Sequence, residues 1–250
     1  MKIVIFGYGV VGKHVESIFP ITNDDIDIWI YDPYKGFSGL PDKYDFAIIC
    51  VPTELIDGKC DISIVEKAIN ESNAKMNIIK STIPPGTTDY LISKYNKDIV
   101  FNPEFSGASL HAKAINENFI ILGGERCRTT VVAEMYKQII TGHNRIMQTT
   151  SKTAELVKYM DYSFLGCKVV FCNEFYRIAE SMGIDYNEMR ELFLMDNRVN
   201  PSHTLVYKAK PYYDSHCLNK DISAVIGFCE NYNPEFIKDI VKNNERFKNE

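Results

Sequence analysis

The stretch KIVIFGYGVVG, residues 2–12, decides the fold of this chain. Residues 2–6 have the apolar, β-branched composition of a buried strand, and glycines follow at positions 7, 9 and 12. In a loop that leads from a strand into a helix, the first glycine permits a tight turn. The second lets a pyrophosphate approach the backbone, and the third lets the helix pack closely on the strand. The segment therefore predicts a dinucleotide-binding βα unit, although a glycine turn with a purely structural role is the alternative.

An acidic residue supports the nucleotide interpretation. The next apolar run, residues 27–31, ends at Asp32, about 20 residues after Gly12, where a carboxylate meets the ribose hydroxyls. Because an acid there repels a 2′-phosphate, the sequence favours NAD over NADP, while the nearby Lys35 favours the opposite. The cofactor residues expected from this region are Gly7, Tyr8, Gly9, Val10, Val11, Gly12, Asp32 and Lys35.

The remaining periodicity divides the chain into two parts. Apolar runs at 46–51, 77–80, 99–102 and 119–123 alternate with helical stretches at 12–19, 62–70 and 87–95, which is typical of a doubly wound parallel sheet. Residues 151–182 have the apolar spacing of a long helix, which Gly183 ends. Asp185 and Glu188 are typical of the start of a second helix that runs through Phe193. Asn233-Pro234 is typical of the start of a last helix. We therefore expect a Rossmann-type α/β domain over 1–148 and a smaller all-helical domain with a long central helix over 149–250.

Composition excludes several classes of protein. Among 250 residues, 28 Lys and Arg stand against 33 Asp and Glu, so a net charge of -5 argues against a general nucleic-acid binder. The longest apolar runs are too short to predict a membrane span. Seven cysteines without a CxxC pair predict neither a disulfide framework nor a metal site, and most are expected to be buried. These features favour a cytoplasmic protein.

Five further segments, in chain order, resemble the UDP-glucose/GDP-mannose dehydrogenase family: CVPT (50–53), STIPPGT (81–87), NPEF (102–105), AELVKY (154–159) and CLNKD (217–221). The resemblance implies NAD-dependent oxidation of the C6 hydroxymethyl group of a nucleotide sugar, UDP-glucose-like, to a carboxylate. In that chemistry a cysteine forms a thiohemiacetal and then a thioester. It also implies a homodimer built on the helix at 151–182.

The resemblance assigns roles residue by residue. Cys217 would be the nucleophile, Lys158 would stabilise the oxyanion, Glu104 would be the base in thioester hydrolysis, and Thr82 and Asp221 would hold the water. Val51, Pro52, Thr53 and Thr82 would add to the cofactor site. The substrate residues would be Glu104, Phe105, Lys158, Tyr162, Arg198, Tyr212 and Tyr213.

Judged from the residues alone, these side chains also fit ordinary structural roles. Cys217 is expected in a polar loop before a helix whose dipole lowers a thiol pKa, but a single cysteine is more often a core residue. Lys158 has the flanking residues of a lysine that extends its ammonium to solvent, and Asp221 has those of a helix cap. Glu104 and Arg198 are equally compatible with solvated surface positions.

Departures from the family cluster on the substrate side. Tyr162 stands where the family has an asparagine, YYDS (212–215) replaces a glycine-rich run, and SGAS (106–109) replaces a leucine and an acid–glycine pair. The chain also stops at Glu250, where the family continues into a third domain. Two alternatives therefore stay open: the same cysteine chemistry on a smaller sugar or sugar phosphate, and an NAD-binding relative or partner subunit without turnover.

Overall fold

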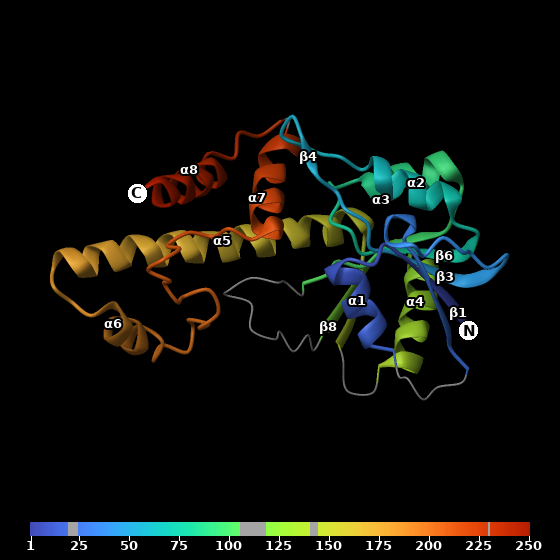
Figure 1. The fold of residues 1–250 in the computed structure, drawn as a ribbon, viewed down its shortest axis with the longest axis horizontal. Helices are drawn as coiled ribbons and strands as arrows, with labels where there is room; N and C mark the ends of the chain where they lie inside the picture. The colour runs from blue at the N-terminus through green and yellow to red at the C-terminus, as the bar shows by residue number, and fades with distance from the viewer. Residues whose placement is uncertain (20–24, 106–118, 141–144, 230) are drawn as a thin grey trace. The chain divides into compact units, whose positions relative to one another are not determined.

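The computed structural model describes residues 1–19, 25–105, 119–140, 145–229 and 231–250 (Figure 1). The described residues up to Lys158 form one compact unit, and those from Tyr159 to Glu250 form another. The SGAS departure at 106–109 lies outside the described residues.

The first unit is organised by one mixed sheet. Its strands, in spatial order, are β2 (Asp27–Tyr31), β1 (Lys2–Phe6), β3 (Tyr44–Ile49), β6 (Ala74–Ile79), β7 (Ile99–Phe101), β8 (Phe119–Gly123) and β9 (Arg145–Thr149). Every neighbouring pair is parallel except β7 and β8. A short antiparallel hairpin, β4 (Leu55–Ile56) and β5 (Lys59–Cys60), stands outside this sheet. The predicted doubly wound architecture is confirmed, with one antiparallel pair added.

The strand order reverses beside β1, which pairs with β2 on one side and β3 on the other. Beyond the strands, Gly7 N donates to Tyr31 O over 2.9 Å and Cys50 N donates to Phe6 O over 2.7 Å. The chain segments that follow β1 and β3 therefore diverge toward opposite faces of the sheet. In open α/β sheets, such a switch point is where a ligand binds.

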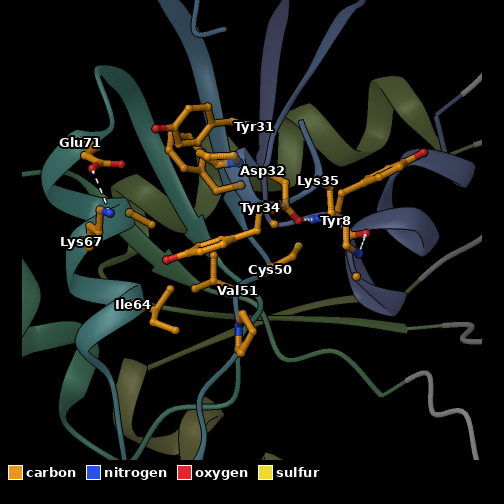
Figure 2. Close-up of a pocket in the computed structure, with 16 residues that line it drawn as sticks. Tyr8, Tyr31, Asp32, Tyr34, Lys35, Cys50, Val51, Ile64, Lys67 and Glu71 are labelled. Atoms are coloured by element: carbon orange, nitrogen blue, oxygen red, sulfur yellow. Dashed lines mark hydrogen bonds and ion pairs between the residues drawn. The ribbon is translucent and has the colours of Figure 1, made fainter. Parts of the chain in front are cut away.

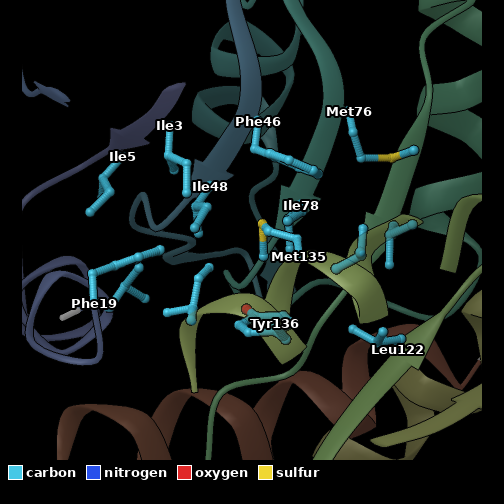
Figure 3. Close-up of a cluster of buried hydrophobic side chains, with 14 of the residues drawn as sticks. Ile3, Ile5, Phe19, Phe46, Ile48, Met76, Ile78, Leu122, Met135 and Tyr136 are labelled. Carbon is cyan, nitrogen blue, oxygen red and sulfur yellow. The ribbon is translucent and has the colours of Figure 1, made fainter. Parts of the chain in front are cut away.

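Helices cover both faces of the sheet because its strands alternate apolar side chains on each side. One face packs Ile3, Ile48 and Ile78 against α1 (Val10–Ser17) and α4 (Arg126–Ile139). Figure 3 shows these side chains gathered over Met135 and Tyr136 of α4. The other face packs against α2 (Ser63–Glu71), α3 (Thr87–Tyr95) and the start of α5 (Ser151–Ser181).

The second unit is helical and contains most of α5 together with α6 (Tyr186–Phe193), α7 (His216–Phe228) and α8 (Glu235–Asn249) (Figure 1). Its main core joins α5, α7 and α8 through Tyr162, Val169, Leu218, Ile222 and Ile240, with Tyr213 from the segment before α7.

Most elements expected from periodicity are present, with end shifts of up to three residues. Gly183 has φ +69°, as a glycine after a helix end requires, and Asp185 accepts a hydrogen bond from Asn187 N as the cap of α6. Some details differ. The strands β4, β5 and β9 and the helix α4 were not predicted. The N-cap position of α8 is Pro234 rather than Asn233, and Cys217 lies within α7 rather than in a preceding loop. Ser215 accepts from Leu218 N at 3.2 Å, so this hydroxyl starts the helix earlier than expected.

Candidate active site: a nucleotide pocket and a buried ionic cluster

The three glycines of the first loop have different environments. A Cβ on Gly7, whose φ is +87°, would lie 2.6 Å from Cys50 O, and a Cβ on Gly12 would lie 2.1 Å from Gly7 O. Both glycines are therefore required by backbone packing. A Cβ on Gly9 would meet no atom within 4 Å, so this backbone faces open space at the start of α1. A helix N-terminus with open space before it is suited to bind a phosphate.

Asp32 and Lys35 both contact the same loop. Tyr8 N donates to Asp32 Oδ2 over 2.8 Å, and Lys35 Nζ donates to Tyr8 O over 2.6 Å. The two side chains come from the turn after β2 and approach Tyr8 from the same side of the pocket, as Figure 2 shows. Asp32, which is expected to bind the ribose, thus also holds the glycine loop that is expected to bind the pyrophosphate.

A pocket of ≈ 650 Å³ opens at this switch point (Figure 2). Of the predicted cofactor residues, those that line it are Gly7, Tyr8, Gly9, Asp32, Lys35, Val51 and Pro52. The others, Val10, Val11, Gly12, Thr53 and Thr82, are not among its lining residues. Its volume and mixed lining fit the nucleotide half of a dinucleotide.

Part of the lining was not predicted. Ile64, Lys67, Ala68 and Glu71 reach the pocket from α2, and Lys67 pairs with Glu71 at 3.9 Å. Their spacing of three and four residues puts them on one helical face, a signal that could have located them. Cys50 also lines the pocket, although sequence reasoning treated it only as a core residue.

A buried ionic cluster follows the ends of β6 and β7. Lys80 Nζ lies 3.1 Å from Glu104 Oε2 and donates to Asn102 Oδ1 over 3.0 Å. Tyr136 Oη also donates to Asn102 Oδ1, at 2.6 Å, while Asn102 Nδ2 donates to Ile121 O at 2.9 Å. Lys80, Glu104 and Asn102 are all buried. A buried charge requires such partners, since desolvation otherwise neutralises it.

Lys158 joins this cluster from α5. Its side chain is 2% exposed, its Nζ donates to the backbone carbonyl of Glu104, and it lies 5.2 Å from the centroid of the Phe105 ring. Lys158 therefore does not extend to solvent, and Glu104 is not a solvated loop acid. Two residues that the family resemblance singled out are in contact.

The charges of the cluster follow from burial and pairing. Burial opposes the positive charge of Lys80, but the groups around it, Glu104 foremost, together favour that charge more strongly, so the pKa of Lys80 is raised and the ammonium persists. Burial raises the pKa of the Cys50 thiol to about 12, and it also raises the pKa of Tyr136. Both of these groups are therefore neutral, and they add no charge to the ion pair of Lys80 with Glu104.

Glu155 ties the loop of Thr82 to α5. Its carboxylate accepts hydrogen bonds from Gly86 N at 2.5 Å, Thr88 N at 2.8 Å and Thr88 Oγ1 at 2.6 Å. Thr82 is half-buried, and its carbonyl accepts from Thr53 Oγ1 at 2.9 Å. The loop is thereby held at both ends, one turn of α5 before Lys158.

In the second unit, the first turn of α7 carries Cys217. This residue is half-buried, whereas Asp221 on the next turn is 1% exposed and pairs with Lys220 Nζ at 2.5 Å. A separation of four residues puts Cys217 and Asp221 on one side of the helix. Since Ser215 is the cap of α7, Asp221 has no capping role.

The predicted substrate residues of the second unit have contrasting environments. Tyr162 and Tyr213 are buried in its core, and Tyr212 is half-buried. Asn244 of α8 fixes Tyr213 by accepting from its N–H at 2.8 Å and donating to its carbonyl at 3.0 Å. Arg198 is 89% exposed and pairs with Asp196 at 2.6 Å.

The described residues contain no helix long and apolar enough to cross a membrane. They also contain no group of three or more His, Cys, Asp or Glu residues placed to hold a metal ion.

Comparisons with known proteins match both parts of the chain. Residues 36–140 match the NAD binding domain of the UDP-glucose/GDP-mannose dehydrogenase family, and residues 152–246 match its central domain. The match to an NAD binding domain confirms the predicted cofactor class. It agrees with a loop in which Gly9 leaves room for phosphate.

Individual relatives are nucleotide-sugar dehydrogenases. The UDP-N-acetyl-D-mannosamine dehydrogenase of Methanocaldococcus jannaschii is 37% identical over 195 residues, which cover 72% of this chain and 44% of the relative. The UDP-glucose 6-dehydrogenase of Rickettsia prowazekii is 25% identical over 258 residues, covering 94% and 59%. A UDP-glucose dehydrogenase structure from Pyrobaculum islandicum has a TM-score of 0.81 at 21% identity, covering 98% and 68%. The chain thus spans about half the length of the curated relatives it matches.

Proposed function

The chain belongs to the UDP-glucose/GDP-mannose dehydrogenase family, and from that premise we propose that it oxidises the C6 hydroxymethyl group of a nucleotide sugar to a carboxylate with NAD. The observation that supports this most strongly is the buried contact between Lys158 and Glu104. Two residues distant in sequence meet there, each of a type that the chemistry requires. A buried lysine and a buried glutamate are costly to keep unless they have a function or a pair.

Binding of the cofactor is assigned to the first unit. The N–H groups at the start of α1 would hold the pyrophosphate across Gly9, and Asp32 would accept hydrogen bonds from a ribose. Val51 and Pro52 would contact the dinucleotide from the opposite side of the switch point. When bound, NAD supplies the hydride acceptor for each of the two oxidations.

Carbon–sulfur chemistry is assigned to Cys217. As a thiolate it would add to the C6 aldehyde, forming a thiohemiacetal whose oxyanion is stabilised by the Lys158 ammonium. Loss of a hydride from that carbon leaves a thioester. Water then adds to the thioester carbonyl while Glu104 accepts its proton, and expulsion of the Cys217 thiolate releases the carboxylate. Thr82 and Asp221 would orient this water.

A UDP-sugar is the substrate class we propose. The relatives from M. jannaschii and R. prowazekii are named for UDP-N-acetyl-D-mannosamine and UDP-glucose. Phe105 beside Lys158, the half-buried Tyr212 and the exposed Arg198 are proposed to contact this substrate. Tyr162 and Tyr213 would act from the core of the second unit, by shaping the segment around Cys217.

A homodimer is proposed through α5. This helix exposes Met160, Phe164, Phe171, Phe175 and Ile178, whose spacing of three, four and seven residues forms an apolar seam. Exposed seams of this spacing are typical of helix pairing. Sedimentation equilibrium tests this proposal: Phe164→Glu together with Phe171→Glu should convert a dimer to a monomer, and a wild-type monomer would contradict it.

The direct test of the function is NADH formation with UDP-glucose, UDP-galactose, UDP-N-acetylhexosamines and GDP-mannose. Turnover with a UDP-sugar that Cys217→Ser removes would support the proposal. Activity only on sugars or sugar phosphates would select a smaller substrate. If the folded chain binds NAD but turns over none of these substrates, it is a non-catalytic relative. Tyr162 favours this alternative, because it occupies the position where the family has an asparagine.

A further inference from the structure

Lys80 is a buried cation that the proposed mechanism leaves unused. We infer that Lys80 is a positioning residue that keeps Glu104 ionised, so that this carboxylate can accept the proton of the hydrolytic water. The inference rests on the proposed function for the role of Glu104. The ion pair itself is a property of the folded first unit.

Geometry fixes Lys80 in one place. Its side chain is 7% exposed, and its Nζ lies 3.1 Å from Glu104 Oε2. The ammonium also donates to Asn102 Oδ1, and Asn102 is itself held by Ile121 O and Tyr136 Oη. These two buried acceptors, one of which is itself fixed by two hydrogen bonds, hold the ammonium beside the carboxylate. It therefore presents a permanent positive charge to the carboxylate.

Four other titratable groups of the described residues lie near Glu104, and each is compared with Lys80 by its charge and by the atom of Glu104 that it approaches. Tyr136 of α4 and Cys50 after β3 stay neutral because burial raises the pKa of each. His14 of α1 lies 4.0 Å from Glu104 Oε1, is 41% exposed, and is charged only when protonated. Lys158 of α5 is a second buried lysine beside Glu104, and its ammonium donates to the backbone carbonyl of that residue.

The consequence for Glu104 follows from desolvation. A carboxylate that is 5% exposed takes up a proton more readily when it loses a cation paired with it, because burial penalises its charged form. A protonated Glu104 has no capacity to act as a base. Removing the Lys80 charge should therefore raise the pKa of Glu104 and reduce hydrolysis most strongly at low and neutral pH.

The test is a carboxyl ¹³C NMR titration of the full chain, with the Glu104 signal assigned through Glu104→Gln. In Lys80→Met the Glu104 titration should move to higher pH by at least about one unit relative to wild type. In Lys80→Arg, which keeps a cation, it should move back toward wild type. Lys97→Met is the matched control, because Lys97 bonds only backbone carbonyls at the end of α2 and should leave Glu104 unchanged. An unshifted Glu104 signal in Lys80→Met overturns the inference.

Two further measurements complete the design. If Lys80→Met does not fold, the double variant Lys80→Met with Glu104→Gln should fold, since it removes both charges together; a double variant as unstable as the single one contradicts the coupling. Where turnover exists, the acid limb of the kcat profile should shift to higher pH in Lys80→Met, with KM for NAD unchanged. Absence of wild-type turnover defeats the proposed function, whereas the NMR titration judges the Lys80–Glu104 pair independently.

Discussion

The two units of this chain hold their candidate residues by different means. In the first unit, Gly7, Asp32 and Cys50 follow the ends of hydrogen-bonded strands, so the backbone of the sheet sets their positions. In the second unit, Cys217 and Asp221 depend on how α7 packs against α5 and α8. Backbone ladders tolerate changes in side chains, whereas helix packing depends on them. This difference agrees with intact cofactor motifs in the first unit and departures such as Tyr162 in the second.

The largest loss of turnover is expected at Cys217, a residue of the second unit that is proposed to take part in the reaction but not in NAD binding. Replacement by serine should lower turnover by about 10³-fold or more, because an alcohol is a far weaker nucleophile than a thiolate. NAD affinity should stay at the wild-type value. Steady-state kinetics and calorimetric NAD titration measure the two quantities. Cys229→Ser, at the other end of the same helix, is the control, and equal losses in both variants would refute a special role for Cys217.

Replacing glycines separates folding from binding within the first unit. Gly7→Ala should cost about 3 kcal/mol of stability, because φ is +87° and the new Cβ would lie 2.6 Å from a backbone oxygen. Gly9→Ala should fold like wild type, since no atom lies within 4 Å, yet lose NAD affinity. Denaturant unfolding and NAD titration check both results. Wild-type NAD binding by Gly9→Ala would show that the phosphate does not pass there.

The second unit offers the matching test of side-chain packing. Asn244→Ala should cost about 2 kcal/mol, because it leaves the buried N–H and carbonyl of Tyr213 without their partner. NAD affinity should not change. The adjacent Asn243→Ala, which removes a half-buried side chain that donates to Asp239 O, should stay near wild type. If both variants unfold at the same denaturant concentration, the clamp on Tyr213 does not stabilise the unit.

The smallest effect concerns the pH dependence contributed by Glu155. Burial raises its pKa above the usual 4.5, and the hydrogen bonds from Thr88 and Gly86 only partly oppose this. A carboxyl with a raised folded pKa stabilises the fold below pH 4.5 and loses that contribution as pH rises through the raised value. The free energy of unfolding should therefore decline less toward neutral pH in Glu155→Gln than in the wild type. Unfolding curves at several pH values check this, and parallel profiles for both proteins would contradict it.

The sequence predicted the fold well where the signal is local. The alternation of buried strands and the glycine spacing located β1, β2, β8 and α3 with their observed bounds. It missed α4, although the buried residues of this helix recur at spacings of three and four. It also missed β9, a five-residue edge strand, and the short hairpin of β4 and β5. It also placed Cys217 before α7, because the capping effect of Ser215 was not recognised.

The candidate site was predicted only in part. The family resemblance singled out Glu104 and Lys158 but gave no sign that they touch, because their contact joins the segment after β7 to α5. Lys80 drew no attention, since a lysine before a serine-threonine loop looks solvated until its burial is seen. Ionic pairs of this kind depend on tertiary packing, which no local pattern encodes.

The central claim is tested most directly by the stoichiometry of NADH formed per UDP-sugar consumed, with the product identified by mass spectrometry. The account predicts two NADH for each molecule of a UDP-sugar converted to its carboxylate. In Cys217→Ser it predicts almost no carboxylate and at most one NADH per sugar, because the first oxidation, to the aldehyde, precedes the addition of the thiolate. Folded, NAD-binding chain that forms no NADH with any of the nucleotide sugars would contradict it.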